Sequence, residues 1–156
     1  MAARTIRPAD GCGSWIWSLR KARSRGCLAP ARIKVRLHRI LLIDDTPEIA
    51  ELLTFSLRDH GYAVFAAGYT ESINELVSEQ RADAVVLDCS VFEMSAALFD
   101  SVRHHPDYAA LPIVIISDTP EEADASLRSR KAQRVLLVPK PFTGSQVANA
   151  LDQLLK

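Results

Sequence analysis

Polar side chains follow the C-terminal ends of four apolar stretches in this chain of 156 residues. In order along the sequence they are Asp44 and Asp45, Asp88, Ser117 and Lys140. The strands of a parallel sheet all end at one edge, and that edge is where such sheets bind ligands. Three carboxylates, a hydroxyl and an ammonium would therefore meet there. This set of groups suits a divalent cation together with a phosphoryl group.

The adjacent pair Asp44 and Asp45 needs a physical reason, because two carboxylates side by side repel each other. The repulsion amounts to roughly 4 kcal/mol at ~4 Å and an effective dielectric constant near 20. A bound Mg²⁺ would offset it, since this ion prefers a few carboxylates completed by water and phosphate oxygens. Alternatively, Asp45 caps the following helix, with Glu48 completing a capping box.

The other three residues suit phosphoryl chemistry. A carboxylate such as Asp88 can act as a nucleophile and form an acyl phosphate, provided that a metal and a cation neutralise the incoming group. Lys140 lies between Pro139 and Pro141, which restrict the backbone and would direct the ammonium toward the strand ends. Ser117 would either cap the next helix or bind a phosphoryl oxygen. A loop-capping aspartate and a solvated loop lysine are the simpler alternatives.

Short apolar runs alternate with helix-period stretches from residue 39 onward, which is typical of βαβ units. The pattern predicts strands over 39–43, 62–66, 84–87, 112–116 and 134–138. It predicts helices over 47–60, 70–80, 95–104, 120–131 and 144–155. Thr143 and Gln146 have capping-box spacing at the start of the last helix, and the helix over 120–131 has few apolar residues to pack. The fold class is therefore α/β, a (βα)5 parallel sheet forming one domain over 39–156.

The net charge of zero hides an asymmetry between two parts of the chain. Residues 1–39 hold ten basic side chains and one acidic one, whereas residues 40–156 hold nine basic and eighteen acidic side chains. We expect residues 1–38 to be a basic, disordered leader. An organellar targeting peptide, a basic binding arm and a reading frame begun too far upstream are alternatives. The acidic body argues against specific DNA binding, and no apolar run is long enough for a membrane span.

The cysteines Cys12, Cys27 and Cys89 are odd in number and lack the spacing of a zinc site. This usage indicates a reduced, cytoplasmic protein. Cys89 directly follows Asp88, but no histidine partner is evident for a nucleophilic thiol. We therefore expect Cys89 to be a bystander.

Residues 39–156 resemble the response-regulator receiver domain of two-component systems. The resemblance is carried by the acidic pair within 43–48 (Ile-Asp-Asp-Thr-Pro-Glu), by Asp88, by Ser117 and by Lys140-Pro141-Phe142. These match, in order, the family's acidic pair, phosphoacceptor, switch hydroxyl and lysine motif. The resemblance implies a flavodoxin-like fold with strand order 2-1-3-4-5. It also implies that a histidine kinase or histidine phosphotransfer protein passes a phosphoryl group to Asp88.

The resemblance further assigns roles within the site. Mg²⁺ would be bound by Asp45, Asp88 and the backbone carbonyl of Ser90, with Asp44 acting through water. The lysine and the switch hydroxyl would bind the phosphoryl oxygens. The chain would not be an enzyme beyond self-catalysed phosphorylation and dephosphorylation, it would bind no organic cofactor, and it would regulate a downstream protein by contact.

Four positions differ from the family pattern. Phe92 and Ala96 replace a proline and a glycine after the phosphoacceptor, Asp118 replaces a small residue after the switch hydroxyl, and Leu137 replaces the switch aromatic. Two functions therefore stay open: a phosphorylatable receiver, and an interaction module that works without phosphorylation. A haloacid-dehalogenase-type phosphohydrolase would need an Asp-x-Asp motif on its first strand. A nucleotide or flavin binder would need a glycine-rich loop there, and the chain has neither.

Overall fold

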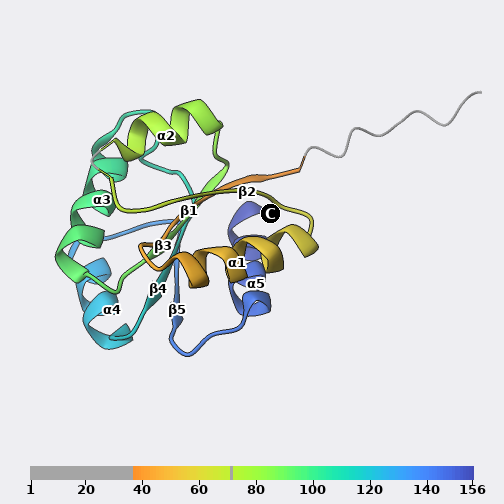
Figure 1. The fold of residues 1–156 in the computed structure, drawn as a ribbon. Helices are drawn as coiled ribbons and strands as arrows, with labels where there is room; N and C mark the ends of the chain where they lie inside the picture. Colours follow the sequence, from red (N-terminus) through yellow and green to blue (C-terminus); the bar gives the residue numbers. More distant parts are fainter. Residues whose placement is uncertain (1–36, 71) are drawn as a thin grey trace, which may run out of the picture. The chain divides into compact units, whose positions relative to one another are not determined.

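The computed structural model describes residues 37–70 and 72–156, and within them five strands alternate with five helices (Figure 1). The elements are β1 (Arg39–Ile43), α1 (Pro47–Asp59), β2 (Ala63–Ala67), α2 (Ile73–Gln80), β3 (Ala84–Asp88), α3 (Phe92–His104), β4 (Ile113–Ser117), α4 (Pro120–Ser129), β5 (Val135–Pro139) and α5 (Gly144–Leu155). The leader predicted for residues 1–38 lies outside the described residues, except for its last two positions. No helix in the described part of the chain is long and apolar enough to cross a membrane.

The five strands form one parallel sheet in the order β2-β1-β3-β4-β5, which confirms the predicted fold class and strand order. Ile43 at the end of β1 is paired with Leu87 near the end of β3. Ser117 at the end of β4 is paired with Pro139 at the end of β5. The register therefore brings the residues that follow these strands to one edge of the sheet.

Helices cover both faces of the sheet, with α1 and α5 on one face and α2, α3 and α4 on the other (Figure 1). Alternate strand residues point to opposite faces, so neighbours in β1 such as Leu41 and Leu42 belong to different hydrophobic clusters. The three central strands are buried on both sides, which explains their continuous apolar sequences. The resulting rigid sheet fixes the positions of the residues at its C-terminal edge.

Two helices begin at other positions than the sequence predicted. Helix α3 starts at Phe92, three residues before the predicted start. Ser95, the first residue of the predicted helix, lies in the first turn of α3, where its hydroxyl donates a hydrogen bond of 2.9 Å to the carbonyl oxygen of Val91, the N-cap residue. Helix α2 starts late, at Ile73, because the Thr70 hydroxyl accepts a hydrogen bond from a backbone amide in the preceding turn.

The last helix is anchored as its sequence predicts. Thr143 accepts a hydrogen bond from the Gln146 amide and the Gln146 side chain bonds back to Thr143, which confirms the capping box. Gly144 opens this helix against α1, and a β-carbon there would lie 1.9 Å from the Ser56 hydroxyl oxygen. Helix α4 buries only Ala123, as expected from its few apolar residues.

Candidate functional site

The centre of the C-terminal edge is a pair of oppositely charged side chains, Asp88 and Lys140. Asp88 ends β3 and is 1% exposed. The Lys140 ammonium, which follows β5, lies 2.7 Å from Asp88 Oδ1. The structure thus brings together two residues that are 52 positions apart, with the carboxylate inside the protein and the ammonium toward its rim.

Lys140 holds several other groups of the site together. Its ammonium donates a hydrogen bond of 2.8 Å to the Ser90 hydroxyl and lies 3.6 Å from Asp118 Oδ2. Burial by itself would lower the pKa of Lys140, but the hydrogen bond and charge of Asp88, together with the charges of Asp118 and Asp44, raise it. The lysine is therefore a fixed positive charge throughout the physiological pH range. The peptide bond between Lys140 and Pro141 is cis.

Asp44 provides the best test of whether the site suits a metal. Its side chain is 5% exposed, and Oδ1 accepts a hydrogen bond from the Thr46 amide. Its other oxygen, Oδ2, is buried and has no hydrogen-bond partner. Burial and the charge of Asp88 raise the pKa of Asp44, against the opposing effect of the Thr46 amide. A cation beside Oδ2 would satisfy this atom and relieve the repulsion between the two carboxylates.

No three His, Cys, Asp or Glu side chains within residues 37–70 and 72–156 are close enough to enclose a metal without further ligands. Mg²⁺ does not require such a cage, because it is commonly bound by one or two carboxylates and keeps several waters. The donors at this edge fit an incomplete, water-completed magnesium site.

Asp45 does not cap helix α1, so the capping alternative is wrong. The N-cap residue is Thr46, and no side chain caps the helix. Asp45 Oδ1 instead accepts a hydrogen bond of 2.9 Å from the Tyr69 amide, in the loop between β2 and α2. A β-carbon on Gly68 would lie only 2.8 Å from the same oxygen, so the glycine allows this close approach.

Ser117 is fully buried at the end of β4. Its carbonyl accepts a hydrogen bond from the Lys140 amide, which ties the two strand ends together. Its hydroxyl accepts a hydrogen bond from the Thr119 amide, while Thr119 itself is the N-cap of α4. Ser117 therefore stabilises the turn before α4 and is not the helix cap.

Asp118 faces the rim of the site. Its side chain is 58% exposed, yet its carboxylate is within 4 Å of the Lys140 ammonium. The Asp118 side chain is therefore solvated and still contributes negative charge to the site. An incoming phosphoryl group would meet this negative charge.

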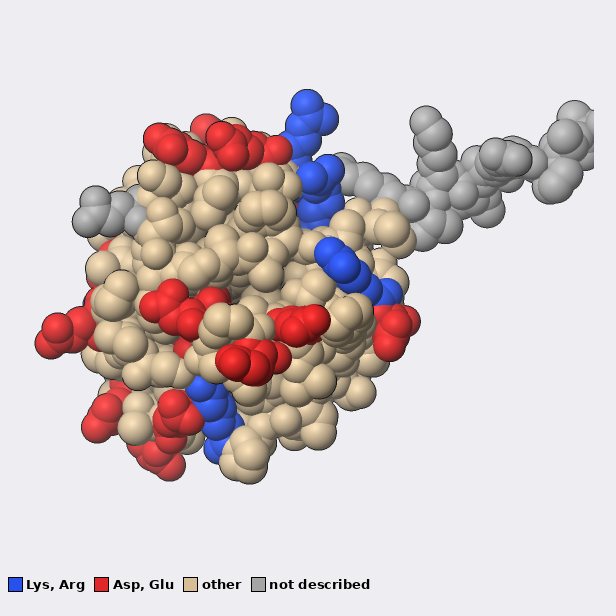
Figure 2. Space-filling model, viewed as in Figure 1, with Lys and Arg blue, Asp and Glu red and all other residues tan. Residues whose placement is uncertain are grey.

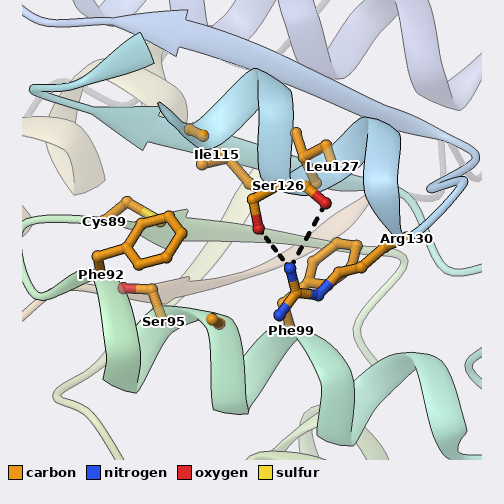
Figure 3. Close-up of a pocket in the computed structure, with 10 residues that line it drawn as sticks. Cys89, Phe92, Ser95, Phe99, Ile115, Ser126, Leu127 and Arg130 are labelled. Carbon is orange, nitrogen blue, oxygen red and sulfur yellow. Dashed lines mark hydrogen bonds between the residues drawn. The ribbon is translucent and has the colours of Figure 1, made fainter. Parts of the chain in front are cut away.

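Phe92 and Ala96, two of the unusual positions, lie on α3 and line a small hollow between α3 and α4 (Figure 3). Phe92 is the first residue of α3, a position that also suits the proline of the family pattern. Cys89 lines the same hollow, and burial raises the pKa of its thiol. A protonated, buried thiol is consistent with the bystander role expected for Cys89.

Tyr69 is a site residue that the sequence reasoning missed. Its hydroxyl donates a hydrogen bond of 2.8 Å to the Asp88 carbonyl oxygen and lies 3.4 Å from Asp88 Oδ2. The same strand-end rule that found the other residues also applies to β2, which ends at Ala67. No charged residue follows β2 directly, and for this reason the loop was overlooked.

The surface around the site carries mostly negative charge. Figure 2 shows acidic side chains spread over the face on which α1 begins, where they outnumber basic ones. This distribution follows from the excess of acidic residues over residues 40–156. It raises the local concentration of cations.

Comparison with known proteins agrees with this arrangement. The family described as response regulator receiver domain matches residues 40–152. The protein named "Probable transcriptional regulatory protein TcrX" from Mycobacterium tuberculosis is 31% identical over 121 residues, which are 75% of this chain and 49% of TcrX. Protein PilH from Pseudomonas aeruginosa is 25% identical over 120 residues, 75% of this chain and 97% of PilH.

Among solved structures, the chemotaxis response regulator CheY4 of Vibrio cholerae superimposes with a TM-score of 0.66 at 21% identity, over 76% of this chain and 99% of CheY4. This likeness shows the fold. The chain spans about half the length of TcrX, so the activity of that whole protein is not transferred. The family match covers most of the chain, and the chain belongs to the response regulator receiver family of two-component signalling.

Proposed function

We propose that this chain accepts a phosphoryl group on Asp88 from a histidine kinase or histidine phosphotransfer protein and regulates a partner protein by contact. The observation that carries the proposal is the buried Asp88 carboxylate, 2.7 Å from the Lys140 ammonium at the ligand-binding edge of the sheet. Membership of the receiver family supports the same role.

In the proposed step, a carboxylate oxygen of Asp88 attacks the phosphorus in line with the P–N bond of a phosphohistidine. That bond breaks, and the imidazole leaves with the electron pair and takes up a proton. Lys140 stays beside the new acyl phosphate and neutralises its oxygens, and the Ser117 hydroxyl donates to another oxygen. Attack by water later regenerates the carboxylate and releases phosphate, so no separate substrate is turned over.

The residues that would hold Mg²⁺ are Asp44, Asp45, Asp88 and the backbone carbonyl of Ser90. The buried, unpartnered Asp44 Oδ2 supports this assignment. When bound, the ion would neutralise charge shared between the carboxylates and the phosphoryl oxygens. We propose that Asp45 contributes after its contact with the Tyr69 amide rearranges, since Oδ1 is engaged there.

A protein donor must bring its phosphohistidine to the Lys140 side of the site. A hollow at this place is lined by Ile49, Leu52, Pro141 and Phe142 together with Lys140 and Asp118. Leu52 is 63% exposed although it lies on a helix that packs on the sheet. An apolar surface beside the acceptor suits contact with a protein donor.

A phosphorylation-independent interaction module is the second candidate. It is favoured by Asp118, whose carboxylate is close to Lys140 and would repel a phosphoryl dianion. In that case Lys140 and Asp88 would form a structural ion pair, and partner binding would be the same for the wild type and Asp88→Asn.

Intact-protein mass after incubation with Mg²⁺ and acetyl phosphate separates the two candidates. The proposal expects the wild type to gain the mass of one phosphoryl group and Asp88→Asn to gain none. A receiver known to react serves as the positive control. An unmodified wild type in a reaction that labels the control would reject phosphoacceptance and select the interaction module.

A further inference from the structure

Tyr69 contacts both carboxylates whose surroundings change when the site is used. Its backbone amide donates to Asp45 Oδ1 at 2.9 Å, and its hydroxyl donates to the Asp88 carbonyl oxygen at 2.8 Å. The hydroxyl also lies 3.4 Å from Asp88 Oδ2. One residue of the β2–α2 loop is thus connected to the proposed acceptor and to a proposed metal ligand.

The tip of the Tyr69 ring is held between β3 and α3. Ser95 on α3 is fully buried, and its hydroxyl lies 2.9 Å from the Asp88 carbonyl oxygen and 3.4 Å from the Tyr69 hydroxyl. Burial is the main reason that the pKa of Tyr69 is raised, and the charge of Asp88 adds to it. The phenol therefore stays protonated and available as a donor at neutral pH.

Tyr69 also reaches the surface of the protein. Together with Thr70, Met94, Ala97 and Leu98 it lines a hollow between the β2–α2 loop and α3. The Met94 side chain is 46% exposed. Tyr69 therefore contacts Asp88 with its hydroxyl and also lines the surface hollow to which Met94 belongs.

We propose that Tyr69 is a positioning residue that ties the chemical state of Asp88 and Asp45 to the surface around Met94. The inference rests on the proposed phosphorylation of Asp88. Acyl phosphate formation replaces the Asp88 carboxylate by a neutral carbonyl and a phosphoryl dianion, so the charge and the acceptor 3.4 Å from the Tyr69 hydroxyl both change. Metal binding by Asp45 would compete with the Tyr69 amide for the same carboxylate. Both changes alter the contacts of Tyr69 with the site, and with them the hollow that Tyr69 lines.

The methionine content of the chain offers a clean test, because Met1 and Met94 are its two methionines. Protein labelled with ¹³C in the methionine methyl groups gives two signals, and Met94→Leu assigns them. Spectra are recorded before and after addition of Mg²⁺ and acetyl phosphate, and intact mass is measured on the same samples. The variants are Tyr69→Phe, which removes only the hydroxyl, and Tyr108→Phe, whose ring stacks on His105.

The proposal expects the Met94 signal to shift on phosphorylation in the wild type and in Tyr108→Phe. In Tyr69→Phe the phosphorylation-induced shift should fall to less than half of the wild-type shift when each is scaled by the phosphorylated fraction that the mass gives. The coupling is overturned if the Met94 signal of the phosphorylated wild type does not move. It is also overturned if the shift in Tyr69→Phe equals the wild-type shift. In both cases the proposed function stands.

Two further outcomes are informative. If Tyr69→Phe is folded but takes up no phosphoryl group, its hydroxyl serves the reaction itself and the coupling is overturned. If the wild type gains no mass, the proposed function fails and the coupling falls with it. The mass measurement therefore distinguishes the two failures.

Discussion

Replacing Asp118 by asparagine should make Asp88 react faster with a charged phosphodonor. The Asp118 carboxylate is 3.6 Å from the Lys140 ammonium, at the rim where a phosphoryl dianion would enter. It attracts the lysine that would bind the phosphoryl oxygens and repels the dianion. Both effects slow phosphorylation, so removing the Asp118 charge should raise the rate.

The size of the effect follows from this distance. At 3.6 Å two unit charges interact by about 5 kcal/mol at an effective dielectric constant of 20, but by about 1 kcal/mol in water. Because the Asp118 side chain is 58% exposed, the lower figure applies. An energy of about 1 kcal/mol corresponds to a roughly fivefold faster reaction of Asp118→Asn with acetyl phosphate.

The assay is the initial rate of mass gain with acetyl phosphate at low and high ionic strength. The advantage of Asp118→Asn should shrink as the screening length falls from about 8 Å at 0.15 M salt to about 3 Å at 1 M. Asp124→Asn is the matched control, because it removes the same charge from a carboxylate that pairs with Arg128 on α4. A rate for Asp118→Asn that equals the wild-type rate, or a gain that high salt leaves unchanged, would show that the Asp118 charge does not slow phosphorylation.

Three other substitutions test separate parts of the account by urea denaturation. Asp44→Asn should raise the free energy of unfolding at pH 7, since burial raises the pKa of Asp44 and makes its charged form costly. The gain should shrink as the pH falls through this raised pKa and disappear below 3.8, where the carboxyl is protonated in the unfolded chain as well. Mg²⁺ should stabilise the wild type more than the variant. An unchanged stability would contradict this. Lys140→Met in metal-free buffer should lower the free energy of unfolding by about 2 kcal/mol. This is less than the usual penalty for breaking a buried ion pair, because the lysine is 22% exposed. A variant as stable as the wild type would mean that the buried Asp88 carboxylate does not depend on the Lys140 ammonium. Gly144→Ala should lower the free energy of unfolding by about 1–3 kcal/mol, because the added methyl group overpacks the contact with Ser56. Adding Ser56→Gly to this variant should restore the lost stability. A Gly144→Ala variant as stable as the wild type would show that α1 and α5 are less closely packed.

The parallel sheet could be predicted because the central strands are continuously apolar and the chain alternates regularly between strand and helix, whereas its strand order followed from the resemblance to receiver domains. Runs such as residues 84–87 are too short for a helix and are buried on both faces, so their type was clear. Helix starts were harder. Ser95 has the residue type of a cap, but tertiary contacts with β3 give its hydroxyl another partner.

The candidate site was predictable to the extent that it depends on strand ends. Asp88 and Lys140 were expected to meet, and they form an ion pair. The partner of Asp45 was not predictable, because the Tyr69 amide comes from a loop whose path depends on the packing of α2 and α3. The direction of the Asp118 side chain could not be predicted either, because a residue just after a strand can turn toward the site or toward solvent.

The most direct test of the central claim is to locate the phosphoryl group. Wild-type protein is treated with Mg²⁺ and acetyl phosphate and then reduced with borohydride, which converts an aspartyl phosphate to homoserine. Peptide mass analysis then identifies the modified position. We expect modification at Asp88 and at neither Asp44 nor Asp45. Modification at another carboxylate, or none when a control receiver is modified, would contradict it.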